Sequence, residues 1–272
     1  MIIPITEQPS VYRHLETKKI EEITSFINVE NAVVAGAISE ALPQINKLIY
    51  AIVDKLKNGG RMFYLGAGSG GRLSVLDVIE LPTTFGIEKG IINTILAGGI
   101  EHLAEAREEM EDHYDEGWVK LKKEKINLKD IVIGISASGT TPFVLGALEA
   151  CRKNNIETGC IVSNPDTPIA RQSSYPVEVI TGPEFITGST RMKCGTAQKM
   201  LFDMISTTVM IQLGRVEDNQ MVNVMLINKK ITDRAVKMLM ERAAIPSYET
   251  ARTLLLKYGS VKNAIDHMKQ SI

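Results

Sequence analysis

The chain has 272 residues, and its 31 Lys and Arg against 32 Asp and Glu give a formal net charge of −1. This balance leaves no basic surplus that would attract nucleic acid. Apolar stretches are too short for a membrane span and the N-terminus lacks a signal-peptide pattern, so we expect a cytoplasmic protein without membrane or nucleic-acid partners.

The N-terminal section, residues 1–51, is predicted to be helical. Apolar residues recur at helical spacing around 15–27 and again over 32–56. The pattern ends at Asn58-Gly59-Gly60, a typical helix terminator.

The middle section, residues 52–215, alternates between strand and helix patterns. The strand candidates are short and rich in Ile and Val, as expected for strands buried on both faces: 61–66, 91–96, 130–135, 157–163 and 176–180. Helix candidates lie between them, at 70–80, 100–124, 142–154 and 166–173. This alternation predicts an α/β fold with a doubly wound, mainly parallel five-stranded sheet. Ligands of such sheets bind at the carboxyl ends of the strands.

The C-terminal region, residues 216–272, is predicted to contain short helices. A long apolar helix over 193–213 precedes it. Within the region, Glu241–Lys269 has the pattern of a small three-helix unit.

Two loops rich in glycine and hydroxyl groups follow predicted strands. Residues 66–73 (GAGSGGRL) join an apolar run to a helical pattern, and residues 136–142 (SASGTTP) do the same further on. Backbone N–H groups at such loops bind anions, so two of them at one sheet edge suggest a phosphorylated small molecule. The alternative is that these Ser and Thr residues only cap helices. The phosphate candidates are Ser69, Ser138, Gly139, Thr141, Ser189, Thr190 and Arg191.

Neither a cofactor nor a metal is indicated. The loops lack the Gly-Lys-Ser/Thr end of an ATP-binding loop and the complete dinucleotide fingerprint with its acidic ribose partner. The three cysteines and four histidines have neither disulfide nor metal-ligand spacing. We therefore expect a small-molecule substrate and no cofactor.

Glu80 is the most suggestive acidic residue, because it ends the helix that follows the first loop. A carboxylate close to a ligand loop can donate or accept a proton, although an ordinary solvated glutamate would give the same pattern. Glu111 lies in an acid-rich stretch, 101–112, most of which should face solvent. Spacing alone does not select Glu111 from that stretch.

Several longer motifs occur together: 66–68 (GAG), 76–77 (LD), 80–83 (ELPT), 97–99 (AGG), 137–142 (ASGTTP) and 187–199 (TGSTRMKCGTAQK). In these motifs the chain resembles the N-acetylmuramic acid 6-phosphate etherase family, which has the sugar-isomerase (SIS) fold. The resemblance runs from about Thr6-Glu7 to the C-terminal helices, and the block 187–199 is its most specific part.

This resemblance implies a lyase that cleaves the ether between D-lactate and the sugar, without metal or nucleotide. The products would be N-acetylglucosamine 6-phosphate and D-lactate, in the recycling of cell-wall sugars. The implied chemistry is elimination across C2–C3 of the ring-opened sugar, followed by addition of water. By motif position, Glu80 is implied as the main acid/base group and Glu111 as the second, with Glu108 as the alternative to Glu111.

The resemblance also extends the implied substrate-binding set to Gly68, Gly70 and Lys193. It implies a homodimer, because one SIS unit supplies only part of a site in this superfamily. The long apolar helices could instead only cover their own sheet.

Four residues depart from the family pattern. Ser69-Gly70 stands where Thr-Ser is usual, Thr140 where Arg is common, and Cys194 where alanine precedes Gly-Thr-Ala-Gln-Lys. Two other functions are therefore kept. One is a sugar-phosphate-binding regulator without catalysis, like glucokinase regulatory protein, although that protein carries two SIS units. The other is a sugar-phosphate isomerase, against which the block 187–199 argues.

Overall fold

The computed structural model describes residues 3–105 and 107–270. The chain divides into two compact units, which are described separately. The first combines Met1–Asp77 with Gly90–Ile205, and the second combines Val78–Lys89 with Ser206–Ile272. In the described ranges, no helix is long and apolar enough to cross a membrane.

A five-stranded sheet forms the centre of the first unit. Its strands are β1 (Met62–Gly66), β2 (Ile92–Leu96), β3 (Ile131–Ser136), β4 (Glu157–Val162) and β5 (Tyr175–Glu178). They lie in the order β2-β1-β3-β4-β5, and every neighbouring pair is parallel. The predicted doubly wound α/β fold is thus confirmed, and each predicted strand is present. The order reverses beside β1, where ligand sites of open parallel sheets occur.

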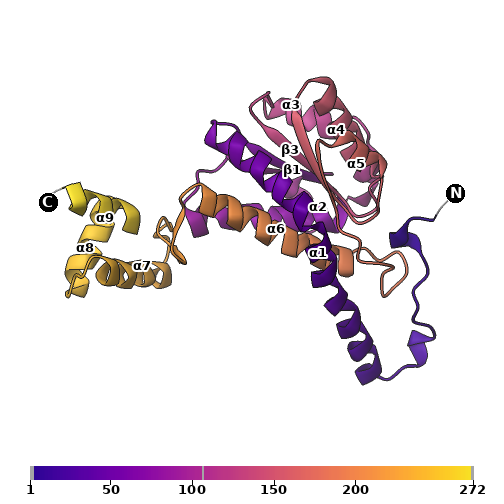
Figure 1. The fold of residues 1–272 in the computed structure, drawn as a ribbon, viewed down its shortest axis with the longest axis horizontal. Coiled ribbons are helices and arrows are strands. Elements are labelled where there is room, and N and C mark those ends of the chain that lie inside the picture. Colours follow the sequence, from indigo (N-terminus) through magenta and orange to yellow (C-terminus); the bar gives the residue numbers. More distant parts are fainter. Residues whose placement is uncertain (1–2, 106, 271–272) are drawn as a thin grey trace. The chain divides into compact units, whose positions relative to one another are not determined.

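Helices pack on both faces of this sheet. The helices are α1 (Ile20–Lys57), α2 (Gly68–Phe85), α3 (Glu116–Lys123), α4 (Pro142–Lys153), α5 (Pro168–Gln172) and α6 (Lys193–Gln212). In Figure 1, α3, α4 and α5 cover one face, while α1 and α6 lie on the other. The side chains of β1 point alternately to these two faces, as strand geometry requires. Phe63 and Leu65 join the apolar core under α3 and α4. On the other face, the ring of Tyr64 packs against that of Phe202 in α6, with 5.0 Å between the ring centroids.

Three of the predicted helical segments differ from the structure. Residues 15–17 form a short 3-10 helix, and from Ile20 the segment 15–27 continues with 32–56 in one helix, α1, because helical hydrogen bonding runs through residues 28–31 and past Pro43. The predicted helix 100–124 was wrong. The structure has 3-10 helices at Ile100–His102 and Glu108–Asp112, and α3 begins only at Glu116. Like charges spaced four residues apart destabilise a helix, and the acid-rich stretch contains several such pairs.

The second unit is a small helical domain with its own core. It contains α7 (Lys229–Arg242), α8 (Tyr248–Tyr258) and α9 (Val261–Gln270), so its three helices begin earlier than the predicted unit 241–269. Asn228 and Ser247 cap α7 and α8 through their side chains. A short antiparallel pair, β6 (Val216–Glu217) with β7 (Gln220–Met221), precedes these helices.

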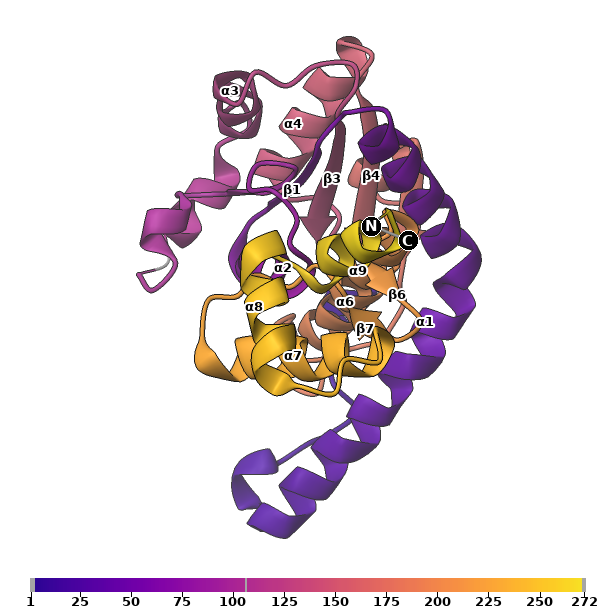
Figure 2. The same cartoon turned by 90° about the vertical axis from the view of Figure 1, so that its left-hand side faces the viewer.

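The N-terminal part of α1 extends beyond the edge of the sheet, as Figure 2 shows. It leaves apolar side chains exposed, among them Ile20 at 76 %, Val29 at 56 % and Val33 at 45 %. These three side chains are therefore left largely uncovered by the described residues, whereas Phe26 on the same part of α1 packs against the ring of Tyr12.

Candidate functional site

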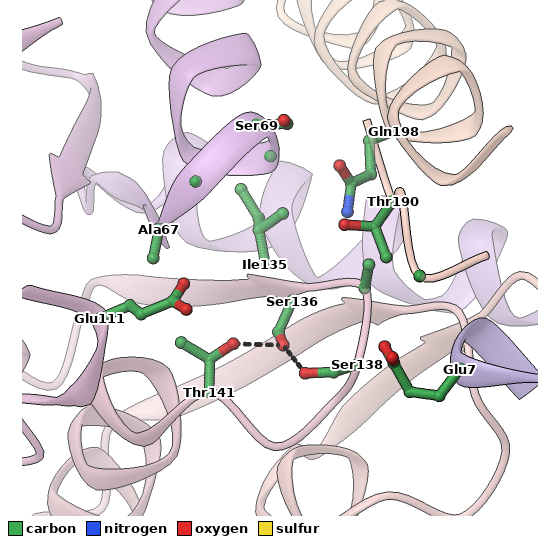
Figure 3. Close-up of a pocket in the computed structure, with 14 residues that line it drawn as sticks. Glu7, Ala67, Ser69, Glu111, Ile135, Ser136, Ser138, Thr141, Thr190 and Gln198 are labelled. Carbon is green, nitrogen blue, oxygen red and sulfur yellow. Dashed lines mark hydrogen bonds between the residues drawn. The ribbon is translucent and has the colours of Figure 1, made fainter. Parts of the chain in front are cut away.

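A cavity of about 190 Å³ opens at the carboxyl edge of the sheet, wholly within the first unit (Figure 3). The start of α2 with the residue before it, the end of β3, the segment before α6 and α6 itself meet there with the 3-10 helices Ile5–Glu7 and Glu108–Asp112. Its lining residues are Glu7, Ala67, Gly68, Ser69, Gly70, Glu111, Ile135, Ser136, Ala137, Ser138, Thr141, Gly188, Thr190 and Gln198. Both predicted anion loops thus face one space.

The second loop presents hydroxyl groups rather than helix caps. The Ser136 hydroxyl lies 2.8 Å from that of Thr141 and 3.2 Å from that of Ser138, as Figure 3 shows. Ser136 Oγ also accepts the backbone N–H of Gly139 at 3.0 Å. Thr141 is the N-cap residue of α4, yet its side chain makes no capping bond to that helix. Its hydroxyl points into the loop, beside a helix N-terminus whose dipole favours an anion.

Glycines shape both loops. Gly68 and Gly139 have φ values of +53° and +75°, which glycine adopts readily. A Cβ on Gly139 would lie 2.3 Å from Thr167 Cγ2, and one on Gly70 would lie 2.7 Å from Ile135 Cγ2 and 2.8 Å from Gln198 Oε1. Gly70, where the family usually has Ser, therefore keeps β3 and α6 close to the loop.

Glu111 supplies a half-buried carboxylate to the cavity. Burial raises the pKa of this carboxyl above its usual value, and the negative charges of Glu108 and Asp112 raise it further. The positive charge of Arg72 acts in the opposite direction. Such a group exchanges a proton closer to neutral pH than an ordinary glutamate does.

Glu80 is exposed on α2 and belongs to the residues of the second unit. The described lining of the cavity comes from the first unit alone. The catalytic role implied for Glu80 by its motif stays a prediction.

The block 187–199 contributes Gly188, Thr190 and Gln198 to the described lining. Of its predicted ligands, Thr190 lines the cavity, whereas Ser189, Arg191 and Lys193 are not among the described residues that do. Lys193 is buried and pairs with Glu30 of α1. In the same region, Glu184 accepts the backbone N–H groups of Lys193 and Cys194 at the start of α6, both at 2.9 Å. Lys193 and its neighbours thus anchor α6.

The first-loop residues Gly68, Ser69 and Gly70 all line the cavity, as do Ser138 and Thr141 of the second loop. Gly139 is buried beside Thr167 and positions its loop. Thr140, where Arg is common in the family, donates its hydroxyl to Ser138 Oγ at 3.1 Å.

Three lining residues with polar side chains were not among the predicted site residues: Glu7, Ser136 and Gln198. Glu7 reaches the cavity because its neighbour Thr6 is tied to Asn164 by two hydrogen bonds, of 3.2 and 3.0 Å. Asn164 in turn donates to the carbonyl groups of Ala137 and Ser138. The family resemblance begins at about Thr6-Glu7, and this was the feature of the sequence from which Glu7 could have been predicted. Gln198, 2 % exposed, was hidden in an apolar helix pattern.

The sheet with its two anion loops places the chain in the SIS-domain class. A model of the SIS domain matches residues 103–208, and one of the glucokinase regulatory protein N-terminal SIS domain matches residues 44–152. A phosphoheptose isomerase structure from Neisseria gonorrhoeae is similar with a TM-score of 0.53 at 14 % identity, over 70 % of this chain and 97 % of that one. That similarity supports the fold alone.

Similarity along nearly the whole chain shows which family within this class the protein belongs to. The chain is 52 % identical to an N-acetylmuramic acid 6-phosphate etherase from Bacteroides fragilis, over 98 % of this chain and 95 % of that protein. It is 51 % identical to another N-acetylmuramic acid 6-phosphate etherase, from Porphyromonas gingivalis, over 99 % of this chain and 98 % of that protein. The chain belongs to the N-acetylmuramic acid 6-phosphate etherase family, as its motifs predicted.

Proposed function

We propose that this protein cleaves the D-lactyl ether of N-acetylmuramic acid 6-phosphate, giving N-acetylglucosamine 6-phosphate and D-lactate. The observation that carries the proposal is the cavity, where hydroxyl groups and the starts of α2 and α4 offer a phosphate site beside the Glu111 carboxylate. The near-complete similarity to etherases supports the choice of substrate. The place of the reaction is the recycling of cell-wall amino sugars in the cytoplasm.

The proposed reaction is an elimination followed by a hydration. In the ring-opened sugar the C1 aldehyde acidifies the C2 proton, which a carboxylate removes. The C2–H electron pair then forms the C2=C3 double bond, and the C3–O bond breaks as lactate leaves with a proton from a carboxylic acid. Water adds its hydroxyl to C3 and a proton returns to C2. We assign these transfers to Glu80 and Glu111, a pair of glutamates in acid and base roles.

Phosphate binding in the cavity would rely on neutral groups. Ser69, Ser136, Ser138, Thr141 and Thr190 bring hydroxyl groups, and the two helix starts bring backbone N–H groups. Helix N-termini favour anions without a paired cation. This arrangement fits a phosphate monoester that must be released after each turnover.

A homodimer is proposed because each protomer leaves the surroundings of Glu80 open. On α2, Leu76 and Ile79 are 40 % and 60 % exposed, and Leu76 shares a helix face with Glu80 at the i,i+4 spacing. On α1, Ile20 and Val29 are exposed as well and offer a further apolar surface that a second copy would cover. A second copy that covers Leu76 and Ile79 would bring another protomer's groups near Glu80.

Release of D-lactate tests the proposed function. The purified protein is incubated with N-acetylmuramic acid 6-phosphate in ¹⁸O-water, and both products are quantified. We expect equal amounts of D-lactate and N-acetylglucosamine 6-phosphate, with solvent oxygen at C3 of the sugar, because water replaces the lactyl oxygen there. An isomerase would release no lactate, and a binding regulator would bind the sugar phosphate unchanged.

The pH profile of kcat/KM should depend on the charges that surround Glu111, because they shift the pKa of its carboxyl group. Its raised pKa is due to burial first and to Glu108 next. Replacing Glu108 with Gln removes a negative charge, so the pKa of Glu111 falls and the limb that Glu111 controls moves to lower pH. This direction holds whether Glu111 acts as acid or as base. The control is Glu109→Gln, which removes an exposed charge from the same 3-10 helix. An equal shift of that limb in Glu109→Gln would contradict the assignment of the limb to Glu111.

A further inference from the structure

The charges around the cavity leave one part of the proposed substrate without a partner. N-acetylmuramic acid 6-phosphate carries a phosphate and, on its lactyl group, a carboxylate. Glu7 and Glu111 are the charged side chains among the described lining residues, and neither Lys nor Arg is part of that described lining. The hydroxyl groups and helix starts suit the phosphate, so the lactyl carboxylate requires a cation from nearby.

Arg72 occupies such a position. It lines a narrow crevice that shares Ala67, Gly68 and Glu111 with the cavity. The crevice measures about 10 Å³, about the smallest space that holds one water molecule, so a ligand group can enter only when a side chain moves. Arg72 Nη2 donates to Glu108 Oε1 at 2.9 Å, and the Arg72 side chain is 31 % exposed.

We propose that Arg72 binds the lactyl carboxylate of the substrate and that this carboxylate displaces Glu108 from the guanidinium group. The proposal rests on the proposed function, since only an etherase substrate carries the lactyl group. An arginine fork matches a carboxylate with two parallel hydrogen bonds. Glu108 is 58 % exposed, so solvent can receive its carboxylate when it leaves.

The two ends of the cavity differ in charge, and this difference gives the substrate a direction. Figure 3 shows Glu111 at one end and Glu7 at the other, with the hydroxyl groups of Ser136, Ser138 and Thr141 between them. Arg72 and Arg107 line the crevice at the Glu111 end. Glu7 has no ion pair with another described residue, so its negative charge disfavours a carboxylate at its end.

This direction agrees with the proposed chemistry. The lactyl group is attached at C3, next to the C2 atom that loses its proton. A lactyl carboxylate held by Arg72 therefore brings the bonds that break toward Glu111. Arg72 is close enough to Glu111 for its charge to be felt there, since it opposes the raised pKa of that carboxyl. Arg72 is thus assigned as a specificity residue for the lactyl ether.

The test compares two ligands that differ by the lactyl group. In one D-lactate release assay, the KM for N-acetylmuramic acid 6-phosphate and the inhibition constant of N-acetylglucosamine 6-phosphate are measured for wild type and Arg72→Met. We expect the KM to rise about 10- to 100-fold, as for the loss of a charged hydrogen bond, while the inhibition constant stays within about twofold. An equal rise in both constants, or a rise in neither, would overturn the proposal.

Two further variants separate recognition from structure. Glu108→Gln breaks the same ion pair but keeps the cation, so on the flat part of its pH profile its KM should be unchanged or lower. A KM increase equal to that of Arg72→Met would show that the pair serves the fold, and would overturn the proposal. Arg171→Met is the matched control, because Arg171 Nη2 likewise pairs with a carboxylate, Asp166, at 2.8 Å. If Arg72→Met does not fold, Arg72→Lys replaces it and should give a smaller KM increase with an unchanged inhibition constant.

The failure of this inference is distinguishable from failure of the proposed function. A folded wild type that releases no D-lactate would refute the etherase reaction itself, and this inference with it. A wild type that releases D-lactate, together with an Arg72→Met variant of unchanged KM, would refute only the role of Arg72.

Discussion

Replacing Glu80 with glutamine is expected to lower kcat for D-lactate release by about 10²- to 10⁴-fold, the usual contribution of a general acid or base. Glutamine has nearly the same shape but cannot transfer the proton. Because Glu80 is exposed on α2, the substitution leaves the apolar cores of both units intact. The thermal unfolding midpoint should therefore not change, and the measurement pairs steady-state kinetics with a melting curve.

The matched control for this variant is Glu88→Gln. Glu88 is another exposed glutamate in the same stretch of the second unit, shortly after α2 ends. It should retain full activity. Activity near the wild-type level in Glu80→Gln would remove Glu80 from the mechanism and leave Glu111, with Glu108 as its alternative, for the acid/base role.

Mixing two inactive variants tests whether the proposed dimer shares its sites. If Glu80 of one protomer acts with Glu111 of its partner, Glu80→Gln and Glu111→Gln protomers should together regain part of the wild-type activity after subunit exchange. Each mixed dimer then contains one site with both glutamates. No recovery in verified mixed dimers would mean that both glutamates act within one protomer.

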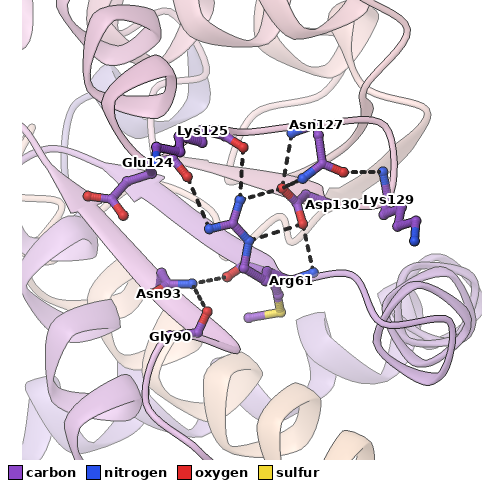
Figure 4. A network of polar contacts seen from close by, with 9 residues as sticks. Arg61, Gly90, Asn93, Glu124, Lys125, Asn127, Lys129 and Asp130 are labelled. Carbon is purple, nitrogen blue, oxygen red and sulfur yellow. Dashed lines mark hydrogen bonds and ion pairs between the residues drawn. The ribbon is translucent and has the colours of Figure 1, made fainter.

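Replacing Asp130 with alanine is expected to lower the free energy of unfolding by about 3–5 kcal/mol, as for other broken buried ion pairs. The Asp130 carboxylate is 1 % exposed and accepts hydrogen bonds from Arg61 and Asn127 (Figure 4). Arg61 contributes its backbone N–H at 2.9 Å, Nε at 3.3 Å and Nη2 at 2.8 Å. Alanine would leave the partly buried guanidinium group and these donors without their acceptor.

This network ties together the starts of two central strands. Arg61 directly precedes β1 and Asp130 directly precedes β3, so the network lies at the sheet edge opposite the cavity. The variant should therefore lose stability in urea titrations while any folded fraction keeps its KM. The control is Asp166→Ala, whose exposed ion pair with Arg171 should contribute little. Equal losses in both variants would contradict the importance of the buried pair.

Local sequence patterns were enough to predict the sheet and several residues that line the cavity. Runs of Ile and Val identified the strands, because strands buried on both faces are apolar throughout. The two glycine loops could be assigned to one edge, because carboxyl ends of parallel strands meet there. Ser69, Ser138 and Thr141 follow from that local reasoning, and all three line the cavity.

The tertiary structure alone decided which other side chains join them. Glu7 reaches the cavity because distant contacts hold the N-terminal segment there, among them those of Thr6 with Asn164, 158 residues away. Lys193, which the resemblance implied as a ligand, contacts Glu30, 163 residues away, and Glu111 is distinguished from its acidic neighbours by its burial in the cavity wall. Local patterns reflect backbone preference and burial along one element. The partner of a charged side chain depends on which distant segments fold together, and that information is spread over the whole chain.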